Sequence, residues 1–353
     1  MPSLAAIRAL AGSFVLPCLV GLAGGYVFHR LGMPAAWMSG ALVAATIAAL
    51  AGLRIRVPGP IGRALFLLVG TVLGSAVTPE TLRLMVTWPI SMAGLAVLIP
   101  AIVAAITVYL VRVERFDRET AFYASVPGAL SYVMALALAS RADARVVAVI
   151  QSFRLVLLMA VLPGLISVAG LASAGNRAIA AASPGHWSDF PLLFVLSVSC
   201  GLGMERLRVP GGATVGAMLA SAILHGTGLV TATIPEGVMI VGFAVMGVMI
   251  AERFAGTSLV EIRQLLRASV AAFVIGTVIS ILCALIVAWI TGLKVGKVVL
   301  AYAPGGIEAM AILAFLLDMD PAFVGAHHIV RFLGIALMLP LTVRLVLGPR
   351  NRS

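Results

Sequence analysis

The chain has 353 residues, of which 62% are hydrophobic and only 10% are charged, and its mean hydropathy is +1.15. Soluble proteins carry about 25% charged residues, so this composition excludes a soluble globular fold and indicates an integral membrane protein. The net charge of +11 does not indicate a nucleic-acid partner, because the basic residues lie in short loops between apolar segments and form no basic cluster.

Apolar segments long enough to cross a bilayer, about 17 to 25 residues each, recur along the whole chain. The longest polar gaps, at residues 172–188 and 252–267, are too short to form a core. The three cysteines lie inside apolar segments without CxxC spacing, which predicts buried free thiols. We expect apolar segments at residues 9–28, 33–53, 60–78, 86–111, 120–140, 146–171, 189–204, 210–230, 235–251, 268–291, 296–317 and 321–343.

The first half of the sequence recurs in the second half, first at an offset of 176 residues and then, after a one-residue gap, at 177. We therefore predict an all-α membrane protein of two repeats, residues 1–171 and 186–353, joined by a linker at 172–185. Duplication of this size is common in secondary transporters. The matching pairs are Gly25 and Gly201, Arg30 and Arg206, Pro34 and Pro210, Gly40 and Gly216, Pro127 and Pro304, Gly128 and Gly305, Asp143 and Asp320, Arg154 and Arg331, and Pro163 and Pro340.

Two of the apolar segments, 120–140 and 296–317, contain a Pro-Gly pair near the middle. Proline lacks the backbone donor and clashes with the preceding turn, so a helix is expected to break there. From Glu119 to Pro127 is 8 residues, about 12 Å of helix, enough to reach the middle of a bilayer core about 30 Å thick. We expect each segment to be re-entrant or discontinuous, and a continuous kinked helix is the alternative.

The basic residues favour the re-entrant arrangement. If all twelve segments cross, 13 Lys and Arg fall on the N-terminal side and 9 on the other, which is almost no bias. If the two Pro-Gly segments enter and leave on one face, the distribution becomes 17 against 5, and two arginines lie inside spans. The positive-inside rule prefers the second arrangement. Each repeat then crosses five times, so the repeats are inverted. Both termini are expected to be cytoplasmic, in a bacterial inner membrane.

The two Pro-Gly tips are expected to meet near the membrane centre, each followed by a short helix whose N-terminal N–H groups attract an anion. Four residues after each proline stand Ser131 and Glu308. A charge at this depth costs about 2.5 to 3.5 kcal/mol on insertion scales, so Glu308 is expected to face a cavity, a partner or a substrate. We predict that it is the coupling residue.

Arg154 and Arg331 lie eleven residues after Asp143 and Asp320, which are predicted N-caps, and therefore about 16 Å along the next helix. A mid-membrane arginine needs a partner, which can be Glu308, the tip carbonyls or an anionic substrate. The predicted substrate-binding residues are Pro127, Gly128, Ser131, Gln151, Arg154, Pro304, Gly305, Gly306, Glu308, His328 and Arg331.

Enzymatic motifs fail on inspection. His327 and His328 are about 100° apart on a helix, and the five histidines have no metal-site spacing. GLKVGK at 292–297 is one residue too short for a phosphate loop, and HExxH and GxSxG do not occur. We expect neither an enzyme nor a bound metal or cofactor. The GxxxG spacings at 21–25, 70–74 and 212–216 predict close helix packing.

The duplicated motif, APGGIEAMAIL with Asp320, His328 and Arg331 and VPGALSYVMAL with their counterparts, resembles the AbrB-duplication membrane family over essentially the whole chain. That resemblance implies an architecture similar to inverted-repeat, proton-coupled carriers. The first copy departs from the family pattern at Ala129 and Ser131.

The leading hypothesis is a secondary transporter of a small anionic organic solute, with the solute and the lipid bilayer as its partners and the oligomeric state open, a homodimer included. The family's names keep two alternatives open. A membrane-bound regulator of gene expression would need an output surface, and an ammonia monooxygenase would need a cluster of metal ligands.

The topology makes a first prediction. Cysteines placed at Arg115 and Arg141 should both be labelled from the cytoplasm, and cysteines at Lys294 and Asp318 from the periplasm, because the predicted re-entrant segments enter and leave on one face. Labelling of Arg115→Cys and Arg141→Cys from opposite faces would show that segment 120–140 crosses fully.

Overall fold

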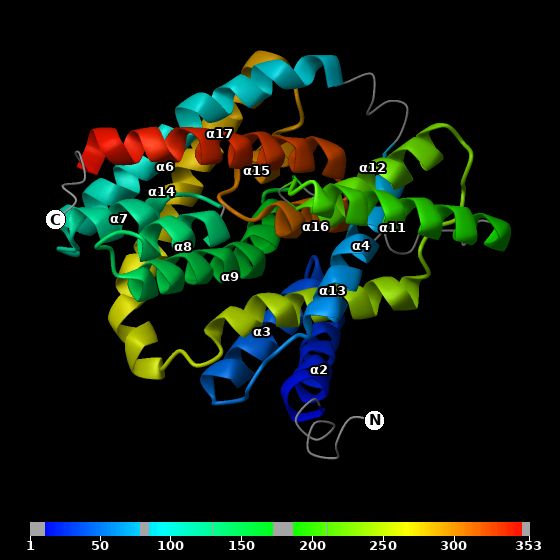
Figure 1. Cartoon of the computed structure of the whole chain (residues 1–353), viewed down its shortest axis with the longest axis horizontal. Helices are drawn as coiled ribbons and strands as arrows, with labels where there is room; N and C mark the ends of the chain where they lie inside the picture. Colours follow the sequence, from blue (N-terminus) through cyan, green and yellow to red (C-terminus); the bar gives the residue numbers. More distant parts are fainter. Residues whose placement is uncertain (1–10, 78–84, 129, 172–185, 210, 348–353) are drawn as a thin grey trace. The chain divides into compact units, whose positions relative to one another are not determined.

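The computed structural model describes residues 11–77, 85–128, 130–171, 186–209 and 211–347 (Figure 1). Within these ranges the chain forms fourteen α-helices and no β-strand, which confirms the predicted all-helical class. The helices of the first half are α2 (Leu16–Arg30), α3 (Ala36–Leu50), α4 (Gly59–Ser75), α6 (Trp88–Arg112), α7 (Arg118–Ser125), α8 (Leu130–Leu138) and α9 (Ala144–Val168). Those of the second half are α11 (Phe190–Arg206), α12 (Gly212–Gly226), α13 (Glu236–Ala251), α14 (Leu259–Thr291), α15 (Val295–Tyr302), α16 (Ile307–Leu316) and α17 (Pro321–Leu347). The cysteines on α2, α11 and α14 are free, as predicted, but half-buried.

The duplicated sequence reappears as a duplicated pattern of helix boundaries. Shifting α3 by 176 residues gives the bounds of α12, and shifting α7 by 177 gives the bounds of α15. With the same shift of 177, the first residues of α8 and α9 fall on the first residues of α16 and α17. The order of long and short helices is therefore the same in both halves.

Several of these helices suit a membrane. Six helical stretches among the described residues are long and apolar enough to cross one: Gly12–Arg30, Trp88–Arg112, Ala144–Val168, Glu236–Phe254, Leu259–Thr291 and Pro321–Leu339. Shorter apolar helices, α3, α4, α12 and α16, lie between them in the chain. Together with the composition, these helices support a polytopic membrane protein.

Helix α14 is longer than predicted. It begins at Leu259, nine residues before the expected start at 268, and its 33 residues span about 50 Å. The segment was expected to be a polar gap because it carries Glu261, Arg263 and Arg267, but these residues are good helix formers, and two of them are paired. Arg145 Nη2 on α9 lies 2.6 Å from Glu261 Oε1.

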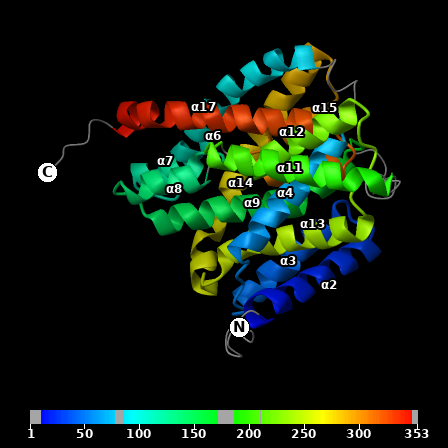
Figure 2. The same cartoon turned by 45° about the vertical axis from the view of Figure 1, so that its right-hand side comes forward.

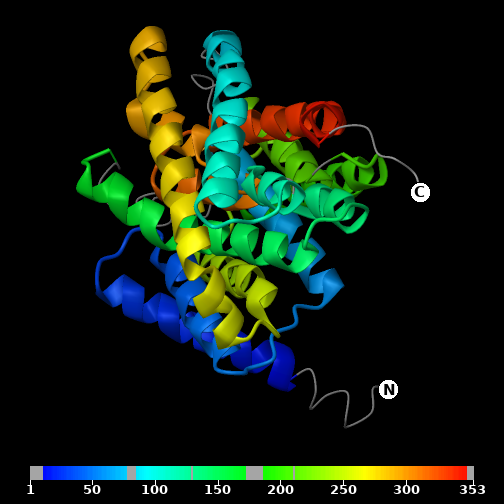
Figure 3. The same cartoon turned by 90° about the vertical axis from the view of Figure 1, so that its left-hand side faces the viewer.

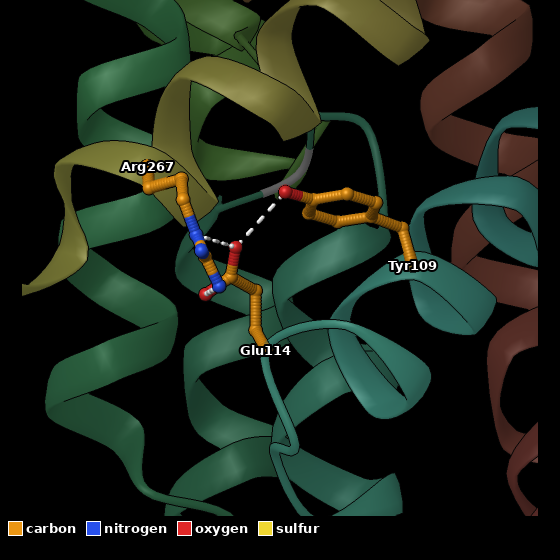
Figure 4. Close-up of polar contacts among 3 residues, drawn as sticks. All are labelled: Tyr109, Glu114 and Arg267. Carbon is orange, nitrogen blue, oxygen red and sulfur yellow. Dashed lines mark hydrogen bonds and ion pairs between the residues drawn. The ribbon is translucent and has the colours of Figure 1, made fainter.

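The second pair joins α14 to the end of α6, beside which it runs (Figure 3). Arg267 donates from Nε to Glu114 Oε1 at 2.8 Å and from Nη2 to Oε2 at 3.1 Å, and the Tyr109 hydroxyl donates to the same carboxylate at 2.9 Å (Figure 4). The hydrogen bond from Arg267 holds the pKa of Glu114 below its ordinary value, against the opposing effect of burial. The N-terminal part of α14 is therefore fixed by ion pairs to Arg145 and Glu114.

The chain divides into two compact units, and each takes parts of both sequence halves. The first unit contains Met1–Leu84, Met159–Leu259 and Ala311–Ala322, and the second contains Met85–Leu158, Val260–Met310 and Phe323–Ser353. The predicted boundaries of the repeats concern the sequence and stay a prediction, and the predicted linker at 172–185 lies outside the described residues.

Glycines set the packing of the first unit, where α3 lies against both α2 and α13 (Figures 1 and 2). A Cβ atom on Gly24 would collide with the carbonyl oxygen of Gly40 on α3, and one on Gly70 with that of Thr214 on α12. A Cβ on Gly216 would lie 2.5 Å from the carbonyl oxygen of Cys200 on α11. The close backbone approach expected from the GxxxG spacings is confirmed at these crossings.

Gly70→Ala should destabilise the protein, because its new methyl group meets the backbone of α12, and overpacking costs about 1 to 3 kcal/mol. Gly203→Ala is the matched control, since nothing lies within 4 Å of its Cβ position on α11 and alanine favours a helix. Thermal unfolding in detergent should show a lower midpoint for Gly70→Ala and an equal or higher midpoint for Gly203→Ala. Equal midpoints for the two variants would contradict the close crossing.

Candidate functional site

Two helical segments are interrupted at the Pro-Gly pairs, and both pairs lie in the second unit. Helix α7 ends at Ser125 and α8 begins at Leu130, while α15 ends at Tyr302 and α16 begins at Ile307. We call residues 126–128 the first tip and residues 303–306 the second tip. Pro127 and Pro304 are both buried. Gly128 has φ +84°, a conformation that favours glycine.

The two tips lie against each other. A Cβ atom on Gly128 would be 3.5 Å from the carbonyl oxygen of Gly305 and 3.3 Å from Nη2 of Arg331. Helix α14 adjoins the second tip, because a Cβ on Gly276 would be 3.6 Å from Cγ of Pro304. Residues 177 positions apart in the sequence are thus brought to one place.

Arg154 holds the first tip. It lies on α9, its side chain is buried, and its guanidinium donates to the carbonyl oxygens at the end of α7: Nη2 to Val126 at 2.9 Å, and Nη1 to Ser125 at 3.4 Å and Ala124 at 3.5 Å. One turn earlier, Gln151 Nε2 donates to the carbonyl oxygen of Tyr123 at 2.9 Å. The carbonyl groups that the broken helix leaves without partners are therefore satisfied by side chains from α9.

Arg331 on α17 holds the second tip in the same way. Its Nη1 donates to the carbonyl oxygen of Ala303 at 2.6 Å and its Nη2 to that of Gly305. His328 Nε2 bonds the carbonyl oxygen of Leu300 at 3.1 Å. Four bonds, from Gln151, Arg154, His328 and Arg331, each span 28 residues of sequence. The two halves thus contain the same arginine clamp.

The clamps differ at one position, His328 against Gln151. Nη2 of Arg331 lies 2.6 Å from Nδ1 of His328. A guanidinium only donates, so Nδ1 must accept this hydrogen bond. Nε2 must then carry the ring hydrogen and donate a hydrogen bond to the carbonyl oxygen of Leu300. His328 is therefore neutral in this arrangement and helps to fix Arg331, whereas Gln151 has no titratable group.

The helices that carry the clamps begin as predicted. Asp143 caps α9, with Oδ1 accepting from the backbone N–H groups of Arg145 at 2.9 Å and Val146 at 3.1 Å. Helix α17 begins at Pro321, directly after Asp320. The tip carbonyls, one of the three partners considered for the arginines, accept hydrogen bonds from both of them.

Glu308 lies in the first turn of α16, and it is half-buried. A carboxylate is favoured there by the partial positive charge of the helix start. Its Oε2 would be 3.9 Å from a Cβ placed on Gly306. The expected approach of Glu308 to an arginine stays a prediction, and the side chain of its counterpart Ser131 lies outside the described residues.

A buried polar cluster beside the second tip was not predicted. The Tyr302 hydroxyl, at the end of α15, donates to the carbonyl oxygen of Ser91 at 2.5 Å, beside Gly94. His327 Nδ1 donates to the carbonyl oxygen of Phe323 at 2.7 Å, and its Nε2 meets Ser91 Oγ at 2.8 Å. Lys297 Nζ lies 4.4 Å from the centre of the Phe323 ring. The sequence feature that could have indicated this cluster is the presence of polar residues inside apolar segments.

Comparison with known proteins gives consistent matches. Residues 37–347 match the family model described as transition state regulatory protein AbrB. The chain is 27% identical over 337 residues to a protein of Escherichia coli K12 named "Putative regulator AbrB", covering 93% of this chain and 95% of that protein. It is 24% identical over 356 residues to "Uncharacterized protein YhjN" of Bacillus subtilis 168, with coverage of 93% and 91%. Both relatives align over nearly their full length.

Removing an arginine clamp should destabilise the fold. Arg154→Ala leaves the Val126 and Ser125 carbonyl groups without donors in an apolar interior, at a cost of about 1 to 3 kcal/mol for each buried group. Arg154→Lys should lose less, because it keeps the charge. Arg63→Ala is the control, since its pair with Glu205 is exposed and such pairs contribute little. A wild-type thermal midpoint for Arg154→Ala would contradict a structural clamp.

Proposed function

The chain belongs to the AbrB family of membrane proteins, and from that premise we propose that it is a secondary transporter for a small anionic organic solute. The observation that carries the proposal is the meeting of two interrupted helical segments, one from each half, held by matching arginine clamps. Interrupted backbone at membrane depth is tolerated only where protein or a water-filled cavity satisfies it. In secondary transporters such segments form the central solute site.

An inverted arrangement of the two halves supports alternating access. The helix boundaries repeat at a nearly constant offset, and the Lys and Arg distribution favours five crossings and one re-entrant segment in each half. Both termini would then be cytoplasmic and the protein would lie in a bacterial inner membrane. Rocking of one packed group of helices against the other would expose the tips to each side in turn.

The charges near the tips favour an anion. Arg154 and Arg331 are 2% and 3% exposed. Helices α8 and α16 begin beside the tips, and the first turn of each carries partial positive charge. A guanidinium has five N–H donors, and among the described residues each arginine bonds three neighbours. A carboxylate of the solute would bind through the further N–H groups of the two arginines.

The transport hypothesis can be tested without knowing the solute. Purified protein would first be screened by thermal shift against a panel of carboxylates, amino acids and ammonium. Each stabilising compound would then be tested as a radiolabelled tracer in proteoliposomes with an imposed pH gradient. We expect a carboxylate to stabilise the protein and to accumulate. Saturable binding with no flux under any gradient would contradict a transporter.

Glu308→Gln should abolish gradient-driven uptake of the carboxylate found in that screen, because the amide cannot bind and release a proton. Exchange of labelled for unlabelled solute should persist, since exchange needs no net proton movement. Asp318→Asn is the control: this acid is exposed two residues beyond α16 and should leave uptake unchanged. Wild-type uptake by Glu308→Gln would remove the coupling role and leave Glu308 as a structural residue.

The family description and the name of the Escherichia coli relative favour a second candidate, a membrane-bound regulator of gene expression. A complementation experiment in a deletion strain distinguishes the two functions. If transcript levels change on deletion and are restored by a transport-inactive variant, regulation is independent of transport. If only transport-active variants restore them, the change in expression follows from the solute.

A further inference from the structure

Helices α6 and α14 of the second unit run side by side in opposite directions (Figure 3). An ion pair joins the residues just after α6 to the N-terminal part of α14. Further along, a Cβ on Gly276 would lie 3.5 Å from Cδ1 of Ile106. Towards the other end, a Cβ on Gly94 would lie 3.1 Å from Cγ2 of Val287. Residue numbers rise along one helix as they fall along the other, so each level of α6 has a known neighbour on α14.

Both helices have an apolar exposed side. Every exposed residue of α6 from 89 to 108 and of α14 from 270 to 290 is apolar. At about 100° per residue, the exposed Ile90, Val97 and Val108 fall within about 20° of one another around α6. Five exposed side chains of α14 share an arc of about 80°, and these are Val274, Val278, Leu282, Leu285 and Trp289.

The height of this surface matches a bilayer. Residues 89–108 of α6 span about 29 Å of helix and residues 270–290 of α14 about 30 Å, and the hydrocarbon core of a bilayer is about 30 Å thick. We call the exposed residues of these two ranges the apolar wall. Because the wall is apolar over its whole height and belongs to a membrane protein, lipid acyl chains are expected to cover it.

Charged residues begin at the same end of the wall on both helices. Arg112 is exposed one turn after Val108, and Arg263 is exposed two turns before Val270. These positions are about 6 Å and about 10 Å beyond the wall, and the headgroup region of each leaflet is about 5 to 8 Å thick. Because an arginine side chain is long enough to reach along a helix surface, both guanidinium groups can lie at the depth of lipid phosphate groups.

The acidic residues at this end already have partners. Glu114 and Glu261 form the two ion pairs of α14, while Asp117 and Glu119 accept hydrogen bonds from backbone N–H groups. The two exposed arginines, in contrast, form no ion pair with any residue that the structure describes. Two positive charges are therefore available to an anion at the edge of the wall.

We propose that Arg112 and Arg263 bind the phosphate groups of anionic phospholipids whose acyl chains lie along the apolar wall. A guanidinium and a phosphate form paired, charge-assisted hydrogen bonds. Under the proposed topology these arginines face the cytoplasmic leaflet, where anionic lipids attract basic residues next to a membrane span. The binding depends on the surface of α6 and α14 and does not require transport, so either proposal can fail without the other.

Photoreactive lipids test the proposal on the full-length protein in phosphatidylcholine vesicles. Phosphatidylglycerol and phosphatidylcholine probes, each with a diazirine at the end of one acyl chain, are added at equal low mole fractions, and labelled peptides are mapped by mass spectrometry. Both probes should label the middle of the wall, near Val97 and Val278. Phosphatidylglycerol should label it about fivefold more, because one basic residue near the surface contributes about that factor. Equal labelling by the two probes would overturn the proposal.

Charge variants locate the site. Arg112→Gln combined with Arg263→Gln should remove the preference, whereas Arg112→Lys combined with Arg263→Lys should keep most of it, because lysine keeps the charge. Arg206→Gln combined with Arg208→Gln is the control, since it removes the same charge from exposed residues at the end of α11. A preference that survives the first pair of changes, or that is lost in the control pair, would overturn the site.

Inorganic phosphate distinguishes a lipid headgroup from a soluble anion. Replacing chloride with phosphate at constant ionic strength should leave the preference unchanged, because a lipid is held by its acyl chains as well as by its phosphate group. Loss of the preference in phosphate would assign the two arginines to a soluble anion and overturn the lipid assignment.

Discussion

Carbonyl groups at the end of an interrupted helix need hydrogen-bond donors in a medium that supplies none, and the second unit is arranged around this requirement. A charged side chain that comes from the next long helix can reach several such oxygens at once. Arg154 and Arg331 do so, and they meet the ends of α7 and α15 from α9 and α17. The breaks are therefore stable because each is paired with an arginine, and the buried arginines are tolerated because each has a break to bind.

The two clamps share a geometry, but their neighbours differ in chemistry. His328 stands where the first half has Gln151, Glu308 where it has Ser131, and Lys297 where it has Thr120. His327, bonded near Ser91, corresponds to Ile150. Titratable groups are thus concentrated around the second tip. Under the proposed transport function, both tips would contact the solute, and proton coupling would need a titratable group at only one of them.

Much of the fold could be predicted from the sequence, because helix boundaries follow from local chemistry. The Pro-Gly pairs predict where both helical segments break, Asp143 predicts the start of α9, and the GxxxG spacings predict close helix crossings, all of which the structure contains. The partner of each arginine could not be chosen, because a main-chain carbonyl has no signature in the sequence. The early start of α14 was missed for a similar reason: a run of charges resembles a loop until its partners, Glu114 and Arg145, are known.

The equal spacing of the clamp bonds limits which changes of length the chain can tolerate. From Tyr123 to Gln151 and from Leu300 to His328 the separation is 28 residues, and it is the same for the two arginine bonds. A single residue inserted after the start of α9 would turn Arg154 by about 100° and move it about 1.5 Å along the helix axis. Insertions and deletions between the start of α9 and Arg154, or between the start of α17 and Arg331, should therefore be rare among homologues, whereas the turns at residues 139–142 and 318–319 can vary in length as loops ordinarily do.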